Sequence, residues 1–477
     1  MLKITKKEED FSQWYQDIIT VADLADYSCV KGSMIIKPYG YAIWEQIQHE
    51  LNLMIKAKGV ENMYFPLLIP MNLLYKEADH IEGFAPEVAI VTHAGGEKLE
   101  QEYAIRPTSE TIIYDTFKNW INTYRDLPLK INQWANVIRW EKRTKLFLRT
   151  TEFLWQEGHT VHQTPDEADS FAKEMLEVYR VLAEDILAIP VFTGEKSKSE
   201  RFAGAEKTYT IEAMMQDGKA LQSGTSHNLG DHFSKAFEIT FTDAHNQQVH
   251  PYQTSWGVST RIIGGLIMTH SDDNGLVLPP NIAPIQVVLA CLMNKDEAEN
   301  DKIKDEADSI FKNLTKLGYR VKIDDSDLRI GEKFFKWEQK GVPVRIEIGA
   351  RELANSSVSI FRRDEMKKDS VPLLEISEYV ERIMPKIQAN LYEKALRYQT
   401  QKTLPASTWE QFQKLVEEGN FVIASYDGTD ETESKIKELT KATTRCKPFD
   451  LDQSNLGNCI YSGSQQLQDI YSPNHTS

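Results

Sequence analysis

Residues 129–141 and 149–158 each alternate apolar and polar side chains with a period of two residues, which is the period of a β-strand. A short, polar and basic segment at 142–145 joins the two stretches. Neighbouring strands with so short a connection pair in the antiparallel sense. The pattern therefore predicts an antiparallel hairpin.

One face of this hairpin has an unusual composition for a sheet. On the first strand, Val137, Arg139 and Glu141 share a face. The second strand contributes Arg149, Thr151, Phe153, Trp155 and Glu157 to one face. Burying such charges costs several kcal/mol each unless they pair with one another or with a charged ligand. Two interpretations remain open: the floor of a ligand site, or a solvent-exposed face with cross-strand Arg–Glu pairs.

The composition is that of a water-soluble, multidomain protein. The 477 residues are about three times the length of a common domain, and 41% hydrophobic with 26% charged residues excludes a disordered or collagen-like chain. Six of the first ten residues are charged, where a secretory leader would be apolar, and no apolar run approaches membrane-spanning length. We therefore expect a cytosolic protein with no membrane partner.

Charge and cysteine usage narrow the range of functions further. The formal net charge of −16 repels phosphates at long range, so any contact with nucleic acid must be local. The basic stretches at 340–363 and 435–447 are candidates, although each can equally be an ordinary solvated face. The four cysteines are widely spaced and form no CxxC pair, which indicates a reducing compartment without disulfides.

Helices flank the hairpin on both sides in sequence. Apolar residues recur at helical spacing between residues 39 and 58, and the capping box TPDE at 164–167 starts a second helix. After the proline-rich LVLPPNIAP near residue 280, the pattern changes to alternating strands and helices. A further helix is predicted at 435–445. The resulting division is an α+β domain at 1–280, an α/β domain at 281–385 and a small α/β domain at 386–477.

Three polar clusters lie where chain direction changes. Thr108 and Glu110 in PTSE lie at a strand-to-helix turn, where simple helix capping is the alternative to a ligand role. LQSGTSH at 221–227 supplies several donors and acceptors, although a plain polar loop is the more ordinary interpretation. Arg261 lies in the first turn of an apolar helix, where it opposes the helix dipole, so we expect an anionic or aromatic partner.

No residue pattern establishes a bound metal. His159 and His162 are three residues apart, but neither an HExxH motif nor paired cysteines accompany them. Histidines held by ordinary hydrogen bonds are the more common outcome. A Walker-type loop and a strand-linked GxGxxG are absent, and Gly95-Gly96 indicates a hairpin turn.

In this order, the clusters resemble those of the class II aminoacyl-tRNA synthetases, and more closely the prolyl-tRNA synthetases of the archaeal and eukaryotic-like type. The resemblance covers roughly residues 10–365 and weakens in the last ninety or so. It rests on the segments ADYSCVKGSMIIKPYGYAIWE, PTSE, NVIRWE, RTTEFLWQEGH, RFAGAEKTYTIEA, LQSGTSH, QTSWGVSTR and GVPVRIEIGARE.

The resemblance implies a proline--tRNA ligase that forms prolyl-adenylate from ATP and L-proline and then charges tRNA(Pro). It implies a catalytic domain, an anticodon-binding domain and a C-terminal domain, ATP with Mg²⁺, and a homodimer whose interface includes the first class II motif around Pro66. The catalytic residues it implies are Arg139 and Arg261. A catalytically silent relative that only binds tRNA or regulates another enzyme is the competing hypothesis.

The same resemblance assigns three sets of binding residues. The proline site would be formed by Thr108, Glu110, Arg139, Phe153, Trp155, Glu157, Phe202 and His227. The ATP site would be formed by Arg139, Glu141, Arg149, Gln222, Thr225, Ser259 and Arg261. The anticodon would be read near Lys336, Glu338 and Arg345.

Two features set this chain apart from many relatives. Many relatives hold zinc with four cysteines in the C-terminal domain, whereas this region has only Cys446 and Cys459. Four thiolates cannot be assembled there, so we expect no structural zinc. Bacterial-type relatives also carry an editing domain between the second and third motifs, and the interval between the hairpin and Gln222 is too short for one.

Overall fold

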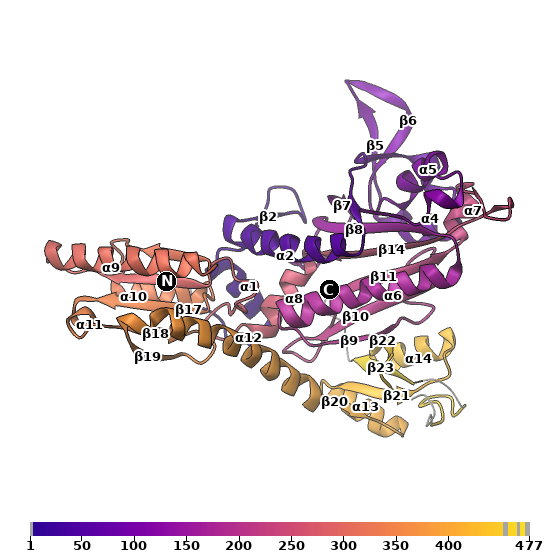
Figure 1. Cartoon of the computed structure of the whole chain (residues 1–477). Coiled ribbons are helices and arrows are strands. Elements are labelled where there is room, and N and C mark those ends of the chain that lie inside the picture. Colours follow the sequence, from indigo (N-terminus) through magenta and orange to yellow (C-terminus); the bar gives the residue numbers. More distant parts are fainter. Residues whose placement is uncertain (1–2, 452–456, 465–467, 473–477) are drawn as a thin grey trace.

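The computed structural model describes residues 3–451, 457–464 and 468–472 (Figure 1). Within these residues one sheet has the strand order β20-β21-β23-β22-β9-β10-β11-β14-β8-β7-β3, and its neighbours are antiparallel except at the two ends. The antiparallel sheet expected for the N-terminal domain is therefore confirmed. Its central strands are β7 (Leu129–Ile138), β8 (Glu152–His162), β9 (Val191–Glu195), β10 (Lys207–Met214), β11 (Ala220–Gly230) and β14 (Tyr252–Ser259), with β3 (Glu61–Asn62) at one edge.

The hairpin predicted from the alternating stretches is β7 and β8, but β7 ends three residues earlier than expected, and β8 begins three residues later and extends to His162. Val137 lies opposite Phe153, and the ladder stops at Ile138 and Glu152, so Arg139 and Arg149 lie in the connection. The connection is long because it is not purely polar: residues 146–148 (LFL) are buried in the core. Burial of this apolar segment draws the chain away from the sheet.

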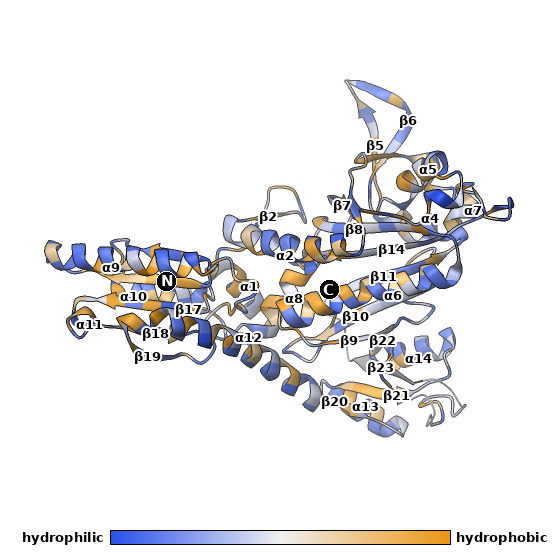
Figure 2. Ribbon diagram, in the orientation of Figure 1, coloured by the Kyte–Doolittle hydropathy of each residue, from blue (hydrophilic) through white to orange (hydrophobic). Residues whose placement is uncertain are grey.

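Two helices cover one face of the central strands. Helix α6 (Pro165–Val181) starts at the predicted capping box, where the Thr164 hydroxyl accepts from the Glu167 N–H at 3.2 Å, and continues as a π-turn over Leu182–Ile186. Helix α8 (Arg261–His270) carries no polar side chain between its first residue and Thr269 (Figure 2). Their core contacts leave the opposite face of the sheet for polar side chains.

The stretch 221–227 is not a loop, contrary to the more ordinary interpretation of its composition. It lies inside β11, between β10 and β14. A Cβ at Gly224 would come within 3.1 Å of Val258 and 3.3 Å of Tyr179, so the glycine allows α6 to pack closely on the sheet. Pairing on both sides and this packing outweigh the weak strand propensity of Ser and Gly.

The remaining N-terminal elements surround this sheet. Helix α2 (Pro38–Ala57) confirms the periodicity seen between 39 and 58. Positive φ angles at Gly95 and Gly96 confirm the hairpin turn of β5 and β6, which projects from the molecule (Figure 1). The other elements are α1 (Phe11–Val21), β1 (Ala25–Tyr27), β2 (Met34–Ile36), β4 (Leu68–Pro70), α3 (Met71–Leu74), α4 (Ala78–Phe84), β5 (Ala89–Ala94), β6 (Glu97–Ile105), α5 (Glu110–Trp120), α7 (His232–Ala236), β12 (Phe241–Thr242) and β13 (Gln248–Val249).

The α/β pattern after residue 284 forms a separate sheet of order β16-β15-β17-β18-β19. Its first three strands are parallel and are joined by helices, as the alternating pattern predicted. The elements are β15 (Val287–Leu292), α9 (Glu297–Lys316), β16 (Val321–Asp324), α10 (Ile330–Gln339), β17 (Val344–Gly349), α11 (Ala350–Ala354), β18 (Ser357–Arg362) and β19 (Lys367–Pro372).

Helix α12 (Ile376–Gln401) leads from this sheet to the C-terminal elements (Figure 1). The boundary expected at residue 385 falls inside α12, which continues through Pro385. The helix predicted at 435–445 ends at Thr440, because the β-branched residues that follow enter a strand. The C-terminal elements are β20 (Thr403–Pro405), α13 (Trp409–Glu417), β21 (Phe421–Ser425), α14 (Asp430–Thr440), β22 (Thr443–Pro448) and β23 (Gln468–Ser472).

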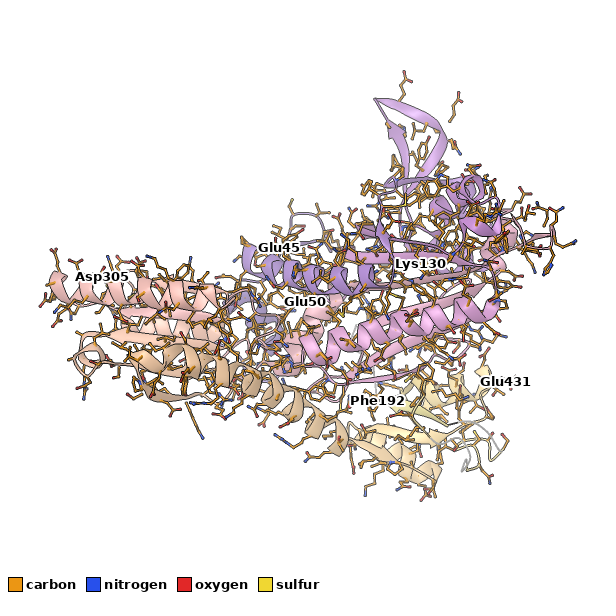
Figure 3. All side chains as sticks on the ribbon, in the orientation of Figure 1. Glu45, Glu50, Lys130, Phe192, Asp305 and Glu431 are labelled. Atoms are coloured by element: carbon orange, nitrogen blue, oxygen red, sulfur yellow. The ribbon has the colours of Figure 1, made fainter. Side chains whose placement is uncertain are left out.

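Acidic side chains on the outer helices account for part of the negative charge. Figure 3 shows Glu45 on α2, Asp305 on α9 and Glu431 on α14, and all three are exposed. Among the described residues, no helix combines the length and the apolar character needed to cross a membrane.

Two buried histidines make stability sensitive to acid. Burial lowers the pKa of His270 from 6.5 to about 4, and its Nε2 donates to the carbonyl of Leu187 at 2.8 Å. The pKa of His227 is lowered to about 3. Below about pH 6.5 the unfolded chain takes up protons that the folded chain does not bind until pH 3–4. Stability therefore falls through this window by up to ~1.4 kcal/mol per pH unit for each histidine.

We expect His270→Gln to remove one of these two contributions. The variant should lose less of its thermal unfolding midpoint than the wild-type protein when the pH is lowered from 7 to 5, since glutamine does not titrate. Thermal unfolding at several pH values measures the difference. An equal loss in both proteins would contradict the assignment.

Candidate active site

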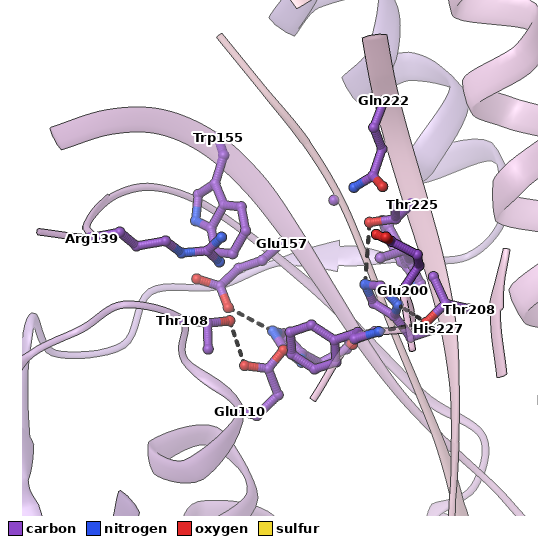
Figure 4. Close-up of a pocket in the computed structure, with 15 residues that line it drawn as sticks. Thr108, Glu110, Arg139, Trp155, Glu157, Glu200, Thr208, Gln222, Thr225 and His227 are labelled. Carbon is purple, nitrogen blue, oxygen red and sulfur yellow. Dashed lines mark hydrogen bonds and ion pairs between the residues drawn. The ribbon is translucent and has the colours of Figure 1, made fainter. Parts of the chain in front are cut away.

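A cavity of about 160 Å³ opens on the sheet face that α6 and α8 leave uncovered (Figure 4). Side chains from the PTSE turn, β8, β10, β11 and β14 converge on it. Seven of the eight residues predicted for the proline site line the cavity, as do Gln222 and Thr225. These seven are Thr108, Glu110, Arg139, Trp155, Glu157, Phe202 and His227.

The PTSE turn places two buried polar side chains at one side of this cavity. Thr108 and Glu110 are 1% and 3% exposed, and the Thr108 hydroxyl donates to the Glu110 carboxylate. Ser109 is the residue before helix α5, but its hydroxyl donates to Glu157 at 2.8 Å and accepts from no backbone N–H of the helix. Simple capping therefore does not explain the turn, which presents an acceptor to the cavity.

The carboxylate of Glu157 is held from several sides. It accepts from the backbone N–H and hydroxyl of Ser109, from Gln133, and lies 2.8 Å from His159 Nε2. Burial would raise the pKa of Glu157, but the hydrogen bonds and charges of His159, Ser109 and Arg106 hold this pKa below its usual value. Glu157 is therefore an ionised anchor that fixes the turn against β8.

Arg139 lies over aromatic rings at the mouth of the cavity. Its guanidinium carbon is 5.0, 5.5 and 5.3 Å from the ring centroids of Phe84, Phe153 and Trp155. Burial lowers its pKa, against the charges of nearby carboxylates such as Glu87 and Glu110. Among the described residues the one hydrogen bond of the Arg139 side chain runs from Nε to the carbonyl of Pro107 at 2.9 Å, so the terminal nitrogens remain available.

His227 forms the opposite wall. Its ring stacks on Phe202 with centroids 4.4 Å apart, and its two nitrogens lie 3.0 Å from the Thr208 hydroxyl and 3.2 Å from the Thr225 hydroxyl. Burial, followed by the positive charge of Arg139, lowers the pKa of His227 to about 3. The ring is neutral at physiological pH and offers an uncharged, flat surface.

Positive charge collects next to the cavity. Burial and then the charges of Arg139, Arg149 and Arg445 lower the pKa of Arg261 to about 10, and its Nε donates to Leu148 at 3.2 Å. Of these four guanidinium groups, those of Arg139, Arg149 and Arg261 were predicted for the ATP site. Cations that repel one another in a partly buried site are stabilised by an anionic ligand.

The other predicted nucleotide residues lie around this region. The Arg149 Nε is 3.9 Å from Glu141, and both side chains are partly exposed. The Ser259 hydroxyl accepts from the Arg261 N–H at 3.1 Å at the start of α8. This partly exposed Arg–Glu pair lies in the connection, outside the paired strands, so it is not a cross-strand pair on a sheet face, whereas Trp155 and Glu157 line the cavity.

The predicted anticodon residues lie on the five-stranded sheet unit, away from the cavity. Lys336 and Glu338 are on α10, and Arg345 is on β17. Arg345 is 4% exposed, pairs with Glu338 and Glu347, and lies between the rings of Phe334 and Phe361. In this arrangement Arg345 orients Glu338, which is the more accessible of the pair.

The sequence patterns did not single out Glu200, Ser255 and Gly257 as cavity residues. The signal that could have found Ser255 is the sheet register, since it lies opposite both His227 and His159. Its buried hydroxyl has no hydrogen-bond partner among the described residues. His159 and His162 have such partners, Glu157 and Tyr114 for the first and Glu167 for the second.

The three regions match three known domain families in order. Residues 92–270 match the class II tRNA synthetase core domain (G, H, P, S and T), residues 286–383 the anticodon binding domain, and residues 409–471 the C-terminal domain of prolyl-tRNA synthetase. The chain is 52% identical to a proline--tRNA ligase of Phocaeicola vulgatus, covering 98% of both chains.

The chain belongs to the prolyl-tRNA synthetase family. Two further relatives of this family are also 52% identical: proline--tRNA ligase 2 of Clostridioides difficile, covering 97% of this chain and 96% of that protein, and the proline--tRNA ligase of Chlorobaculum tepidum, covering 98% of each. The prolyl-tRNA synthetase C-terminal domain fits the archaeal and eukaryotic-like type. The class II core confirms the fold expected from the resemblance, and its chemistry uses ATP.

Proposed function

We propose that this protein joins L-proline to ATP as prolyl-adenylate with release of pyrophosphate, and then transfers proline to tRNA(Pro) with release of AMP. The observation that carries the proposal is the small cavity with a buried acceptor on one side, flat rings on the other and clustered arginines next to it. Proline-dependent exchange of pyrophosphate into ATP, followed by aminoacylation of tRNA(Pro), tests it. A silent relative would show neither.

The proline site would use charge at one end and rings at the other. Thr108 and Glu110 would accept from the secondary ammonium, and Phe202, Trp155 and the neutral ring of His227 would enclose the five-membered ring. Glu157 would act through Ser109, because its carboxylate is already saturated. Phe153 does not line the cavity, and its ring would instead support the guanidinium of Arg139.

The ATP site would neutralise and align the reacting groups. Arg139 would hold the α-phosphate and the attacking carboxylate through its free terminal nitrogens. Arg149, Arg261 and Ser259 would bind the rest of a bent nucleotide, and Glu141 would accept from adenine. Gln222 and Thr225 would contact the nucleotide, which enters as its Mg²⁺ complex. Positioning and charge neutralisation would then do most of the catalysis.

The other partners follow from the same assignment. Lys336 and Glu338, oriented by Arg345, would read bases of the proline anticodon. Two copies would associate through the first motif around Pro66, as a homodimer in the cytoplasm.

We expect no structural zinc: among the described residues no group of three or more His, Cys, Asp or Glu side chains could hold a metal ion, and elemental analysis of the purified protein checks this.

We also expect no editing activity in this chain. The interval between β8 and β11 contains α6, its π-turn, β9 and β10, all of which belong to the synthetase core. Since a pocket separates apolar substrates by only ~1–3 kcal/mol per methylene, alanine should be activated slowly and its ester on tRNA(Pro) should persist. Incubation of alanyl-tRNA(Pro) with the purified protein measures this. Hydrolysis above the spontaneous rate would be incompatible with the prediction.

A further inference from the structure

The C-terminal elements continue the central sheet. Strand β22 pairs with β9 through Lys447–Glu195 and Pro448–Gly194, and β9 pairs with β10. Gly194 allows this approach, since a Cβ there would collide with the backbone of Lys447 and come within 3.0 Å of Cys446 Sγ. The C-terminal domain is therefore joined edge to edge with the strands that carry the active site.

An aromatic contact strengthens the same junction. Phe192 of β9 stacks on Phe421 of β21 with centroids 5.8 Å apart, and Figure 3 shows Phe192 between the central sheet and the C-terminal elements. The Tyr398 hydroxyl at the end of α12 donates to the carbonyl of Gln216 at 2.8 Å. Loss of a single polar side chain would thus leave the junction packed.

One side chain crosses this junction into the core of the synthetase domain. Arg445 of β22 donates from Nη2 to Glu212 of β10 at 3.1 Å, and Lys196 lies 3.0 Å from the other Glu212 oxygen. All three residues are buried: Arg445 is 4% exposed, Glu212 0% and Lys196 5%. Two cations share one carboxylate, so the cluster buries a surplus positive charge.

This cluster lies beside the nucleotide residues. Glu212 is directly opposite Gln222 in the sheet register, and Arg445 is close enough to Arg261 to lower its pKa. Nε of Arg445 is buried with no hydrogen-bond partner in the described part of the chain. A buried cluster of three charged groups adds little to stability, because the cost of removing the charges from water offsets their attraction. A surplus cation next to a triphosphate site, however, favours an anionic ligand.

We propose that Arg445 is a positioning residue of the ATP site: it fixes Glu212, and through it the strand edge at Gln222, and adds positive charge next to Arg261. The proposal rests on the proposed function and gives the zinc-free C-terminal domain a role in adenylate formation. Arg445 reaches the nucleotide only through these residues.

Arg445→Met tests the proposal in proline-dependent pyrophosphate exchange with the full-length protein. We expect the KM for ATP to rise about tenfold while the KM for proline changes less than twofold, because the change removes charge at the nucleotide end only. Arg445→Lys should bring the KM for ATP back to within about threefold of wild type. Lys447→Met, two residues along the same strand, is the matched control and should change neither constant.

An unchanged KM for ATP in folded Arg445→Met, or an equal rise in both KM values, would overturn the proposal. If Arg445→Met does not accumulate as folded protein, Arg445→Gln, which keeps a donor for Glu212 and removes the charge, decides by the same outcomes. The wild-type rate in this assay tests the proposed function separately, so the two failures can be told apart.

Discussion

Arg139→Ala should reduce proline-dependent pyrophosphate exchange by about 10³-fold, equivalent to ~4 kcal/mol of transition-state stabilisation. The reason is that the terminal nitrogens of this guanidinium face the cavity without other hydrogen-bond partners among the described residues. Three aromatic rings and the Pro107 carbonyl fix its direction before any ligand arrives. Arg139→Lys should also be severely impaired, since an ammonium cannot form two parallel hydrogen bonds to the α-phosphate and the carboxylate.

The fold should survive these substitutions, which circular dichroism and the thermal unfolding midpoint can check. The rings of Phe84, Phe153 and Trp155 also contact one another or other apolar groups, so the site does not collapse with the guanidinium. Arg125→Ala, a change of the same kind at an exposed arginine, is the control and should leave exchange unaffected. Exchange within threefold of wild type in a folded Arg139→Ala protein would remove the central assignment.

Gly158→Ala should destabilise the protein by about 3 kcal/mol, at the upper end of what overpacking of a core costs. Gly158 lies in β8 directly opposite Trp256 of β14, and a Cβ there would lie inside the contact distance of the indole ring. The indole cannot move aside, because it is 1% exposed and packs against Phe171 and Tyr179 of α6.

The matched control is Gly331→Ala. This glycine is in the first turn of α10 with open space around its Cα, so alanine should be neutral or slightly stabilising. The thermal unfolding midpoints of the two variants measure the contrast. If Gly158→Ala were as stable as Gly331→Ala, the close contact between β8 and the indole would be incorrect.

Local sequence patterns predicted much of the fold, because residues close together in the chain determine where many of the helices and turns begin and end. The start of α6 follows from a threonine that caps the helix and a proline in its first turn, and the β5–β6 turn follows from two glycines that accept positive φ. The β7–β8 hairpin was predicted as a pair, but its ends were not, since the burial of residues 146–148 depends on α1 and α8.

The candidate site was predictable to the extent that its residues lie in short motifs. PTSE and the second hairpin strand brought Thr108, Glu110, Trp155 and Glu157 together as expected. The strand character of 221–227 depends on pairing with β14, about thirty residues further along the chain, and the contact of Arg445 with Glu212 spans more than two hundred. Side-chain contacts over such separations leave no periodic signal in one sequence.

Helix α12 constrains how this chain can vary in length. Its 26 residues form a rod about 39 Å long between the five-stranded sheet and β20. Each inserted or deleted residue would turn one end by about 100° relative to the other and shift it by about 1.5 Å. Strand β22 would then meet β9 out of register, so changes in length here should be tolerated only in whole helical turns or not at all.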